Sequence, residues 1–295
     1  MISRRHLLLT GAPALLLVPR LVLAQSSEAF GGPAFAAAIA AIEAKSGGRL
    51  GVAVRDTATG ATFARRGDER FPMCSTFKFL LAAAVLAEVD AGRLRLDSTL
   101  PITKADLIAY SPMTESLVGT VASIAALCEA AVTLSDNTAA NVLLKTLGGP
   151  AQLTAFLRRS GDSVTRLDRN EPTLNEGKPG DPRDTTTPLA MLGDLDRMVL
   201  GSVLTPASRQ QLAQWLVANR TGDTRLRAGL PKDWRVGDKT GTGPRGSGIN
   251  DIAVIWPPGR APLLVTSYLT ETALDTKAGH AVHMEVARAL AAAVG

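Results

Sequence analysis

The sequence predicts an α/β protein of the α+β kind, a three-layer α-β-α sandwich with an antiparallel sheet and an inserted all-helical lobe. Three observations predict it: strand patterns lie at both ends of the chain, helical patterns fill the stretch between them, and a long helix closes the chain. Strands from both termini can join in one sheet that helices cover, which leaves the middle of the chain as a separate lobe. The 295 residues, 46% of them hydrophobic, supply the core that such a fold needs.

The first elements are a helix and a β-hairpin. Residues 33–46 have helical spacing and stop at Gly47-Gly48, a typical C-cap because glycine adopts the left-handed conformation without strain. Residues 49–56 and 61–66 flank a Thr-Ala-Thr-Gly turn, as the two strands of a hairpin do.

The later elements follow the same logic. From residue 75 to about residue 229 the signals are mostly helical and are interrupted by glycine and proline. Strand patterns return at residues 234–240, 252–256 and 263–269, and residues 277–294 form the closing helix.

We therefore expect two domains. Residues 25–70 and 215–295 form a discontinuous α/β domain, and residues 71–214 form a helical domain. Within the helical domain, residues 162–184 are crowded with charges and hold three prolines. Loops longer than about 12–15 residues are uncommon in compact domains and are usually functional or disordered. The opposite charges favour an ordered loop, which we call the catalytic loop below.

Residues 1–24 have the composition of an export signal. Arg4 and Arg5 form a basic start, residues 7–18 are apolar, and the segment that ends at Ala24 supplies a cleavage site. The arginine pair also fits a twin-arginine signal, and both export routes stay open. No later run reaches about 18 apolar residues, so we expect a periplasmic or secreted protein without a membrane span.

Charge and composition exclude other classes. The formal net charge is +5, but three arginines lie in the leader, so the remainder carries about +2, too little to favour nucleic acid or an anionic membrane. His280 and His283 lie three residues apart near the C-terminus, and no HExxH motif is present. We expect no metal and no other cofactor, and we expect both histidines on the surface of the closing helix.

Lys78 is the first residue that suggests chemistry. It lies in a segment, residues 75–86, that is apolar on every side of a helix and is therefore buried. Burial lowers the pKa of a lysine, so that its amine can act as a base. Ser75 lies on the same helical face, at a helix start whose N–H groups stabilise an oxyanion. An N-cap serine beside a lysine that reaches the surface also explains this pair.

Two further segments decide between these interpretations. Ser135-Asp136-Asn137 connects two apolar helices, where such residues are also common N-caps. Lys239-Thr240-Gly241 ends a strand pattern, and glycine there allows a ligand to approach the sheet edge, although an ordinary strand end has the same form. Each segment alone has a structural explanation, but chance does not explain all of them in this order.

Together the motifs resemble the signature of the penicillin-recognising serine enzymes, Ser-x-x-Lys, Ser-Asp-Asn and Lys-Thr-Gly. Residues 171–175 (Glu-Pro-Thr-Leu-Asn) further resemble the mark of class A β-lactamases. Arg169 and Asp184 resemble the ion pair that closes the family's loop, and Tyr110-Ser111-Pro112 resembles its substrate-flanking turn. The resemblance runs from about residue 35 to the last helix.

This resemblance implies an enzyme that hydrolyses β-lactam antibiotics, penicillins and cephalosporins, through a serine acyl-enzyme and so gives antibiotic resistance. We expect a monomer whose partner is the small β-lactam substrate. The implied catalytic residues are Ser75, Lys78, Ser135 and Glu171. The implied substrate-binding residues are Tyr110, Asn137, Asn175, Arg225, Lys239, Thr240 and Thr242.

The resemblance also implies a role for each catalytic residue. Ser75 is the nucleophile, and either Lys78 or Glu171, through a water molecule, takes its proton. Ser135 passes a proton to the departing ring nitrogen. The backbone N–H groups of Ser75 and Thr242 form the oxyanion hole.

The binding residues follow in the same way. Lys239 and Thr240 bind the substrate carboxylate, and Asn137 binds the amide side chain. Asn175 helps Glu171 to hold the water that attacks the acyl-enzyme. Arg225 falls where some relatives supply a further cation for the carboxylate.

Two structural features are implied as well. Cys74 and Cys128 should be free thiols, because the positions that pair with them in bridged relatives are Gly243 and Ala82 here. The Glu171–Pro172 bond should be cis, a form that is costly except before proline.

Two alternatives share part of the signature. A D-alanyl-D-alanine peptidase has the equivalents of Ser75, Lys78, Ser135 and Lys239, but lacks a water-activating glutamate such as Glu171. A β-lactam sensor acylates and stays acylated, and is usually tied to a membrane span.

Overall fold

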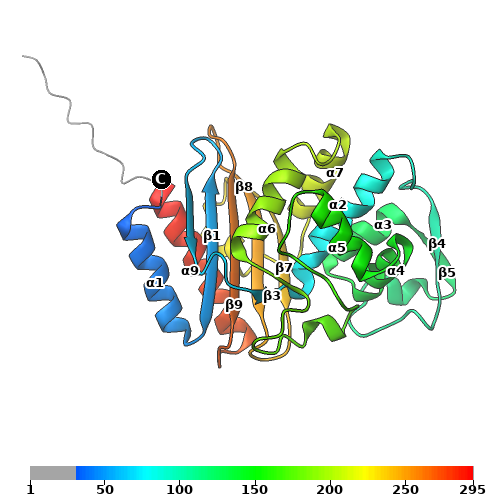
Figure 1. Cartoon of the computed structure of the whole chain (residues 1–295), viewed down its shortest axis with the longest axis horizontal. Helices are drawn as coiled ribbons and strands as arrows, with labels where there is room; N and C mark the ends of the chain where they lie inside the picture. The colour runs from blue at the N-terminus through cyan, green and yellow to red at the C-terminus, as the bar shows by residue number, and fades with distance from the viewer. Residues whose placement is uncertain (1–30, 295) are drawn as a thin grey trace, which may run out of the picture.

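The structure, a computed structural model, describes residues 31–294 (Figure 1). The export signal predicted over residues 1–24 lies outside the described residues. Within residues 31–294, none of the helices combines the length and the apolar character that a membrane crossing requires.

A five-stranded antiparallel sheet, in the order β2-β1-β9-β8-β7, forms the middle layer. The predicted hairpin is β1 (Arg49–Asp56) with β2 (Thr62–Arg65), and the C-terminal part supplies β7 (Arg235–Thr242), β8 (Ile249–Trp256) and β9 (Leu263–Thr270). β1 pairs with β9 along its whole length, so the two ends of the chain meet inside the sheet. The prediction of one antiparallel sheet built from both termini is confirmed.

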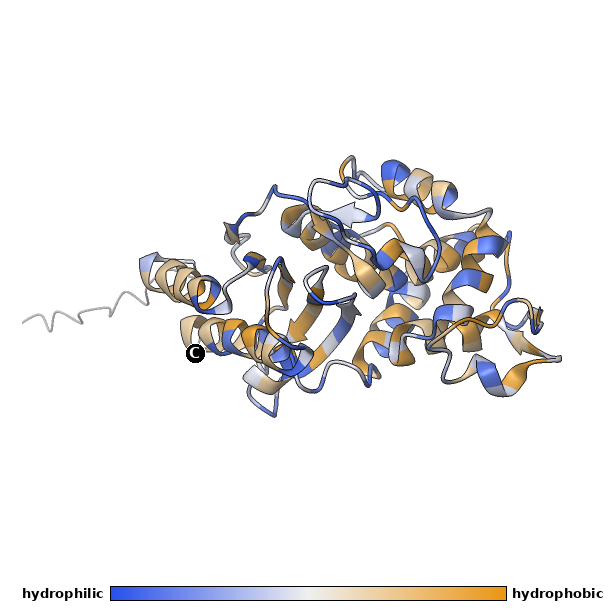
Figure 2. Cartoon of the chain, turned by 90° about the horizontal axis from the view of Figure 1, so that it is seen from below, coloured by the Kyte–Doolittle hydropathy of each residue, from blue (hydrophilic) through white to orange (hydrophobic). Residues whose placement is uncertain are grey.

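Helices cover both faces of this sheet. On one face, α1 (Pro33–Ser46), α8 (Leu226–Gly229) and α9 (Thr276–Val294) bury the side of the strands that includes Val52. Its neighbour Ala53 belongs to the core on the opposite face, because successive strand residues point to opposite sides. The strands between the helical layers carry much of the apolar sequence (Figure 2). The three-layer sandwich is therefore confirmed.

The second face is covered by the helical lobe, whose centre is α2 (Phe77–Asp90). The first ten residues of α2 are all buried, so this helix has no polar side, as its sequence predicts. The helices that complete the lobe are α3 (Ile124–Glu129), α4 (Asn137–Leu147), α5 (Pro150–Arg159), α6 (Pro188–Leu195) and α7 (Pro206–Val217).

Two short strand pairs interrupt the stretch that was predicted to be mostly helical. β3 (Phe71–Pro72) pairs with β6 (Thr185–Thr186), and β4 (Thr99–Ile102) pairs with β5 (Thr120–Ser123). Strands of two to four residues are too short to show a period-two pattern in the sequence. The β3–β6 pair matters for the site, because it joins the segment before Ser75 to the end of the catalytic loop.

The prediction that both histidines lie on the surface is wrong for His283. Its side chain is fully buried where α9 packs on the sheet, with Nδ1 2.8 Å from Ser267 Oγ and Nε2 2.9 Å from the Ile249 carbonyl oxygen. Burial lowers the pKa of His283 to about 3, so the ring is neutral. His280 is partly exposed, with Nδ1 2.9 Å from Thr224 Oγ1.

Candidate active site

Ser75 and Lys78 lie together at the start of α2. Ser75 belongs to a 3-10 turn, Cys74–Thr76, that leads directly into the helix. Lys78 is fully buried in the first turn of α2, and its Nζ lies 3.0 Å from Ser75 Oγ. The lysine is therefore paired inside the protein, and the interpretation that it reaches the surface is wrong.

Three further groups surround the Lys78 amine. Its Nζ donates to Asn137 Oδ1 at 2.6 Å and to the Ser135 carbonyl oxygen at 2.9 Å, and it lies 3.1 Å from Glu171 Oε1. Burial lowers the pKa of Lys78, and the Glu171 carboxylate opposes this shift. The amine thus stands between the Ser75 hydroxyl and a carboxylate, where it can exchange a proton with either.

Ser135 connects the two lysines. A π-helical segment, Ala130–Leu134, ends at Ser135, whose left-handed backbone (φ 58°) turns the chain sharply. Ser135 Oγ accepts hydrogen bonds from Lys239 Nζ at 3.1 Å and from Lys78 Nζ at 3.4 Å. Burial, and then the charge of Lys78, hold the pKa of Lys239 well below its usual range. A hydroxyl between two amines of this kind can relay a proton.

The middle residue of the Ser-Asp-Asn motif has the structural role that the N-cap interpretation predicts. Asp136 caps α4 by accepting the Ala139 N–H at 2.8 Å, while Ser135 and Asn137 contribute to the site on either side of it. The Asn137 N–H donates to the Tyr110 carbonyl oxygen at 3.0 Å, which holds the backbone of Tyr110 beside the site, and the Tyr110 side chain is exposed.

Glu171 reaches the same centre from the catalytic loop. It is buried, with Oε1 accepting the Ser75 hydroxyl at 3.3 Å and Oε2 accepting the Asn175 amide at 2.5 Å. The Asn141 amide holds the backbone of Glu171 by accepting its N–H at 3.0 Å and donating to its carbonyl oxygen at 2.9 Å. The Glu171–Pro172 bond is cis, as predicted.

The catalytic loop is closed by the predicted ion pair. Arg169 Nε lies 2.6 Å from Asp184 Oδ2, and Asp184 is fully buried. The other oxygen of Asp184 accepts the N–H groups of Asp168 and Arg169 at 2.8 and 2.9 Å. One carboxylate therefore fixes the two ends of the segment that carries Glu171.

The outer end of β7 forms the remaining wall. Gly241 is required there, because a Cβ would lie 2.6 Å from the Met73 carbonyl oxygen, beside the turn that holds Ser75. Arg225 is buried and donates to the Gly241 carbonyl oxygen at 2.9 Å and to Thr242 Oγ1 at 2.6 Å. Thr240 lies in the same strand, two residues before Thr242.

The structure brings the predicted residues into one place. A continuous set of hydrogen bonds and ion pairs joins Ser75, Lys78, Ser135, Asn137, Glu171, Asn175 and Lys239. Thr240, Thr242 and Arg225 continue it along β7, and Tyr110 joins it through the backbone of Asn137.

Comparison with known proteins shows the family of the chain. The sequence profile of the β-lactamase enzyme family matches residues 34–294. β-Lactamase L2 of Stenotrophomonas maltophilia is 48% identical over 97% of this chain and 96% of its own, and β-lactamase AST-1 of Nocardia asteroides is 50% identical over 87% and 82%. A solved class A β-lactamase of the last common ancestor of Gram-negative bacteria is 65% identical, covering 89% of this chain and 100% of its own, with a TM-score of 0.87. The chain belongs to the class A β-lactamases.

This class A β-lactamase has two free cysteines, as predicted, and both are buried. Burial raises the pKa of Cys74 to about 12, which keeps it a thiol although it adjoins the nucleophile. A Cβ added at Gly243 or Gly248 would lie 3.1 or 3.0 Å from the sulfur of Cys74. Cys74 therefore fills the wall between the Ser75 turn and the end of β7.

Sequence reasoning missed two residues that hold the β-lactamase site in place. Asn141 binds the backbone of Glu171, and Asn250 donates to the carbonyl oxygens of Pro72 and Met73 at 2.9 and 3.1 Å. Asn141 had a signal, because it lies four residues after Asn137 and hence on the same face of α4. Asn250 had none, because its partners are distant in the sequence.

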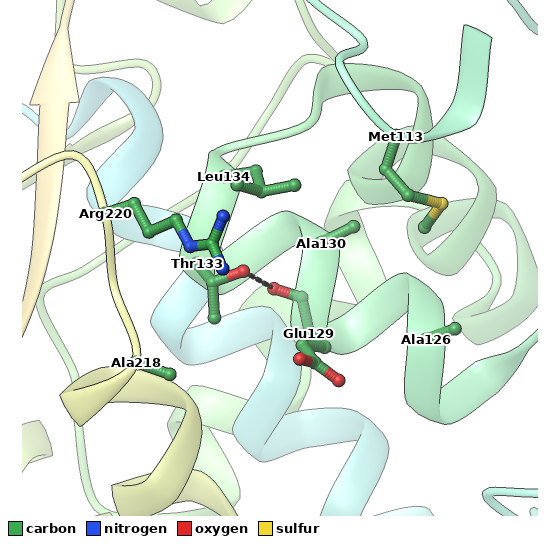
Figure 3. Close-up of a pocket in the computed structure, with 8 residues that line it drawn as sticks. All are labelled: Met113, Ala126, Glu129, Ala130, Thr133, Leu134, Ala218 and Arg220. Carbon is green, nitrogen blue, oxygen red and sulfur yellow. Dashed lines mark hydrogen bonds between the residues drawn. The ribbon is translucent and has the colours of Figure 1, made fainter. Parts of the chain in front are cut away.

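A separate hollow of about 270 Å³ lies beside the π-helical segment that leads into Ser135 (Figure 3). It is lined by Glu129, Thr133 and Arg220 together with small and apolar side chains, and the Thr133 hydroxyl donates to the Glu129 carbonyl oxygen at 2.8 Å. None of the predicted catalytic or substrate-binding residues lines it, so we do not include it in the active site.

Proposed function

We propose that the protein hydrolyses penicillins and cephalosporins through an acyl-enzyme on Ser75, and so gives antibiotic resistance. The observation that carries the proposal is the position of Ser75 Oγ, 3.0 Å from Lys78 Nζ and 3.3 Å from Glu171 Oε1 in a buried cluster. A serine hydroxyl is a weak nucleophile until a neighbouring base takes its proton, and two such bases are in reach.

In the first step, Ser75 Oγ bonds to the carbonyl carbon of the β-lactam and the ring C–N bond breaks. Either Lys78 or Glu171, through a water molecule, takes the serine proton. Ser135 delivers a proton to the ring nitrogen, because its hydroxyl contacts both lysines. The backbone N–H groups of Ser75 and Thr242 hold the carbonyl oxygen as negative charge develops on it.

The substrate is held on both sides of this centre. Lys239 and Thr240 bind the ring carboxylate: both lie in β7 at the wall of the site, and the Lys239 amine is 3.1 Å from Ser135 Oγ. Asn137 binds the amide side chain, with Tyr110 at the rim.

In the second step a water molecule attacks the Ser75 ester, and Glu171 takes the proton of this water, which Asn175 also holds. Asn175 suits this role because its Oδ1 is buried without a hydrogen-bond donor among residues 31–294.

Turnover of a chromogenic cephalosporin by the purified protein tests this function. We expect steady hydrolysis, because Glu171 is in place to activate water against the acyl-enzyme. A single stoichiometric burst would favour the β-lactam sensor. Release of D-alanine from a D-alanyl-D-alanine peptide without drug turnover would favour the peptidase.

We further propose that Arg225 supports binding of the substrate carboxylate through Thr242. Its guanidinium is buried and bonded to Thr242 Oγ1, so it fixes that side chain and adds positive charge behind the site. Arg225→Ala should lower kcat/KM by roughly 10- to 150-fold, as expected for a lost charged hydrogen bond of about 1.5–3 kcal/mol.

The matched comparison for this variant is Thr242→Ala, alone and combined with Arg225→Ala. If Arg225 acts through Thr242, the double variant should be little worse than Arg225→Ala, because neighbours that share one interaction are not additive. The loss should also be larger for a substrate with a free carboxylate than for its methyl ester. Equal losses for both substrates would remove the carboxylate from the explanation.

Three further properties are part of this proposal. The protein is exported through the signal at residues 1–24, becomes periplasmic or is secreted, and acts as a monomer. Its α/β domain comprises residues 25–70 and 215–295, and its helical domain comprises residues 71–214. The domain division is supported by the five-stranded sheet, whose strands all fall in the two α/β segments.

A further inference from the structure

Two carboxyl groups, those of Asp162 and Asp194, are buried at the base of the catalytic loop. Asp162, the first residue of the loop, uses Oδ1 to accept the N–H groups of Val164 and Thr165 at 2.7 and 3.1 Å. Asp194, in α6, uses Oδ1 to accept Arg197 Nη2 at 2.6 Å. The Oδ2 atom of each is buried and has no N–H or hydroxyl partner among residues 31–294. Neither side chain belongs to the reaction centre described above.

A hydrogen bond between the two carboxyl groups requires a proton. Asp162 and Asp194 are close enough that a side-chain hydrogen bond between them contributes to the pKa of each, and ionised carboxylates can only accept. One shared proton would therefore satisfy both unpartnered oxygens at once, whereas two ionised carboxylates in contact would repel.

The surroundings decide which residue carries this proton. Burial, and then the charge of Asp162, raise the pKa of Asp194 well above its usual value. Burial also raises the pKa of Asp162, but hydrogen bonds from Thr165, Asp194 and two backbone N–H groups outweigh it and leave the pKa below its usual value. The proton therefore resides on Asp194.

We propose that Asp194 is a positioning residue for hydrolysis of the acyl-enzyme: its carboxylic acid donates to the Asp162 carboxylate and fixes the start of the catalytic loop to α6. The end of the loop runs into α6, which begins at Pro188. The bond between Asp162 and Asp194 consequently ties the start of the loop to α6, the helix that follows the end of the loop.

This tie is the outermost of a series that leads to Glu171. Next along the loop, the Thr165 and Thr186 hydroxyls lie 2.7 Å apart, and the Arg166 N–H donates to the Thr185 carbonyl oxygen at 3.0 Å. The Arg169–Asp184 ion pair follows, two residues before Glu171. If Asp162 moves away from α6, only the remaining hydrogen bonds and the Arg169–Asp184 ion pair hold the loop, and the carboxylate of Glu171 is less well placed.

Two buried donors near the pair, Arg197 Nε and Tyr268 Oη, also have no hydrogen-bond partner among residues 31–294, so neither is bonded to the orphaned oxygens. Arg197, from the π-helical segment after α6, contacts Asp194 Oδ1 and favours its ionised form, but burial and Asp162 outweigh it. Arg158 of α5 donates to the carbonyl oxygens of Asp162 and Thr165, not to the carboxyl group. On β9, the buried Tyr268 hydroxyl senses the charge of Asp194, and burial first of all raises its pKa, so it stays neutral.

The hydrogen bond should weaken as pH rises through the folded pKa of Asp194. The folded protein holds the Asp194 proton more tightly than the unfolded chain, in which an aspartate has a pKa of about 3.9. The stability that this proton contributes is complete below that value and is lost as pH rises through the higher folded pKa of Asp194. Above that pH, two carboxylates face each other and the loop start is no longer held.

Asp194→Asn tests the proton directly, because the amide donates an N–H to Asp162 at every pH. Deacylation, measured after rapid acylation, should stay close to the parental rate below the folded pKa of Asp194, and the decline of the parent above that pKa should disappear. The melting temperature of Asp194→Asn should rise relative to the parent as pH increases.

Asp194→Ala removes the donor and should slow deacylation about 10-fold or more, with acylation little changed, as expected for a buried acceptor left unpaired.

Asp196→Asn is the matched control, since Asp196 lies two residues away and forms a partly exposed ion pair with Arg55 at 2.7 Å. It should leave both pH profiles unchanged.

The deacylation measurement rests on the proposed role of Glu171, whereas the melting measurement does not. Identical melting curves against pH for the parent and Asp194→Asn would disprove the shared proton, and parental deacylation by Asp194→Ala would disprove positioning. Should Asp194→Ala fail to fold, deacylation by Asp194→Asn above the folded pKa of Asp194 replaces it: a rate that declines like that of the parent would disprove positioning.

Discussion

Glu171→Ala should acylate and then stop. The ester on Ser75 is broken only if a water molecule is held and deprotonated, and by then Ser75 has lost the hydroxyl that bonds to Lys78. Glu171 is the carboxylate in reach, fixed by Asn175 on its Oε2 and by Asn141 on its backbone. General-base assistance is typically worth about 10²–10⁴-fold, and deacylation should slow by that factor.

The measurement is the intact mass of the protein after mixing with penicillin. Glu171→Ala should carry one substrate mass on Ser75, and Ser75→Ala should carry none. Glu176→Ala is the control for a carboxylate lost from the same loop, because Glu176 is exposed and pairs with Arg169 instead of facing Ser75. It should turn over penicillin without accumulating an adduct. Parental turnover by Glu171→Ala would contradict the proposed deacylation step and favour the peptidase or the sensor.

The parts of the fold that the sequence predicted are those with long, regular patterns. Residues 33–46 form α1 as predicted, because the helical spacing ends at a glycine whose left-handed backbone (φ 60°) closes the helix. The hairpin of β1 and β2 was equally clear, since a turn of Thr-Ala-Thr-Gly separates two strand patterns. The burial of His283 was not predictable in this way, because it depends on α9 packing over β8 and β9.

The site residues differ in the same way: some have a local sequence pattern that predicts their role, and others depend on contacts between distant parts of the chain. Lys78 is conspicuous because a lysine in an apolar helix must have a buried partner, and the structure provides several. Which partners they are depends on loops that approach from distant parts of the chain. Asn250 and the Asp162–Asp194 pair had no sequence signal for this reason, since a hydrogen bond between distant residues leaves no spacing to read.

Lys78→Ala should separate the two candidate bases for acylation. Lys78 Nζ is 3.0 Å from Ser75 Oγ, and burial lowers its pKa toward the range in which an amine accepts a proton. Glu171 Oε1 is also close, at 3.3 Å. Acylation is measured without interference in the Glu171→Ala background, where the adduct persists. If Lys78 is the base, adding Lys78→Ala to that background should slow adduct formation by about 10²–10⁴-fold.

The pH dependence supplies the second criterion. Only the neutral amine accepts a proton, so acylation through Lys78 should rise as pH increases through the pKa of Lys78. The Glu171 carboxylate raises that pKa, in opposition to burial, so Glu171→Ala should move the rise to lower pH. Lys145→Ala, an exposed lysine of α4, should leave the rate and the profile unchanged. Slow acylation in Glu171→Ala alone, with no further loss on adding Lys78→Ala, would instead assign the base to Glu171 acting through water. In that case the Lys78 ammonium has an electrostatic role beside Ser75, and its buried position would still be required.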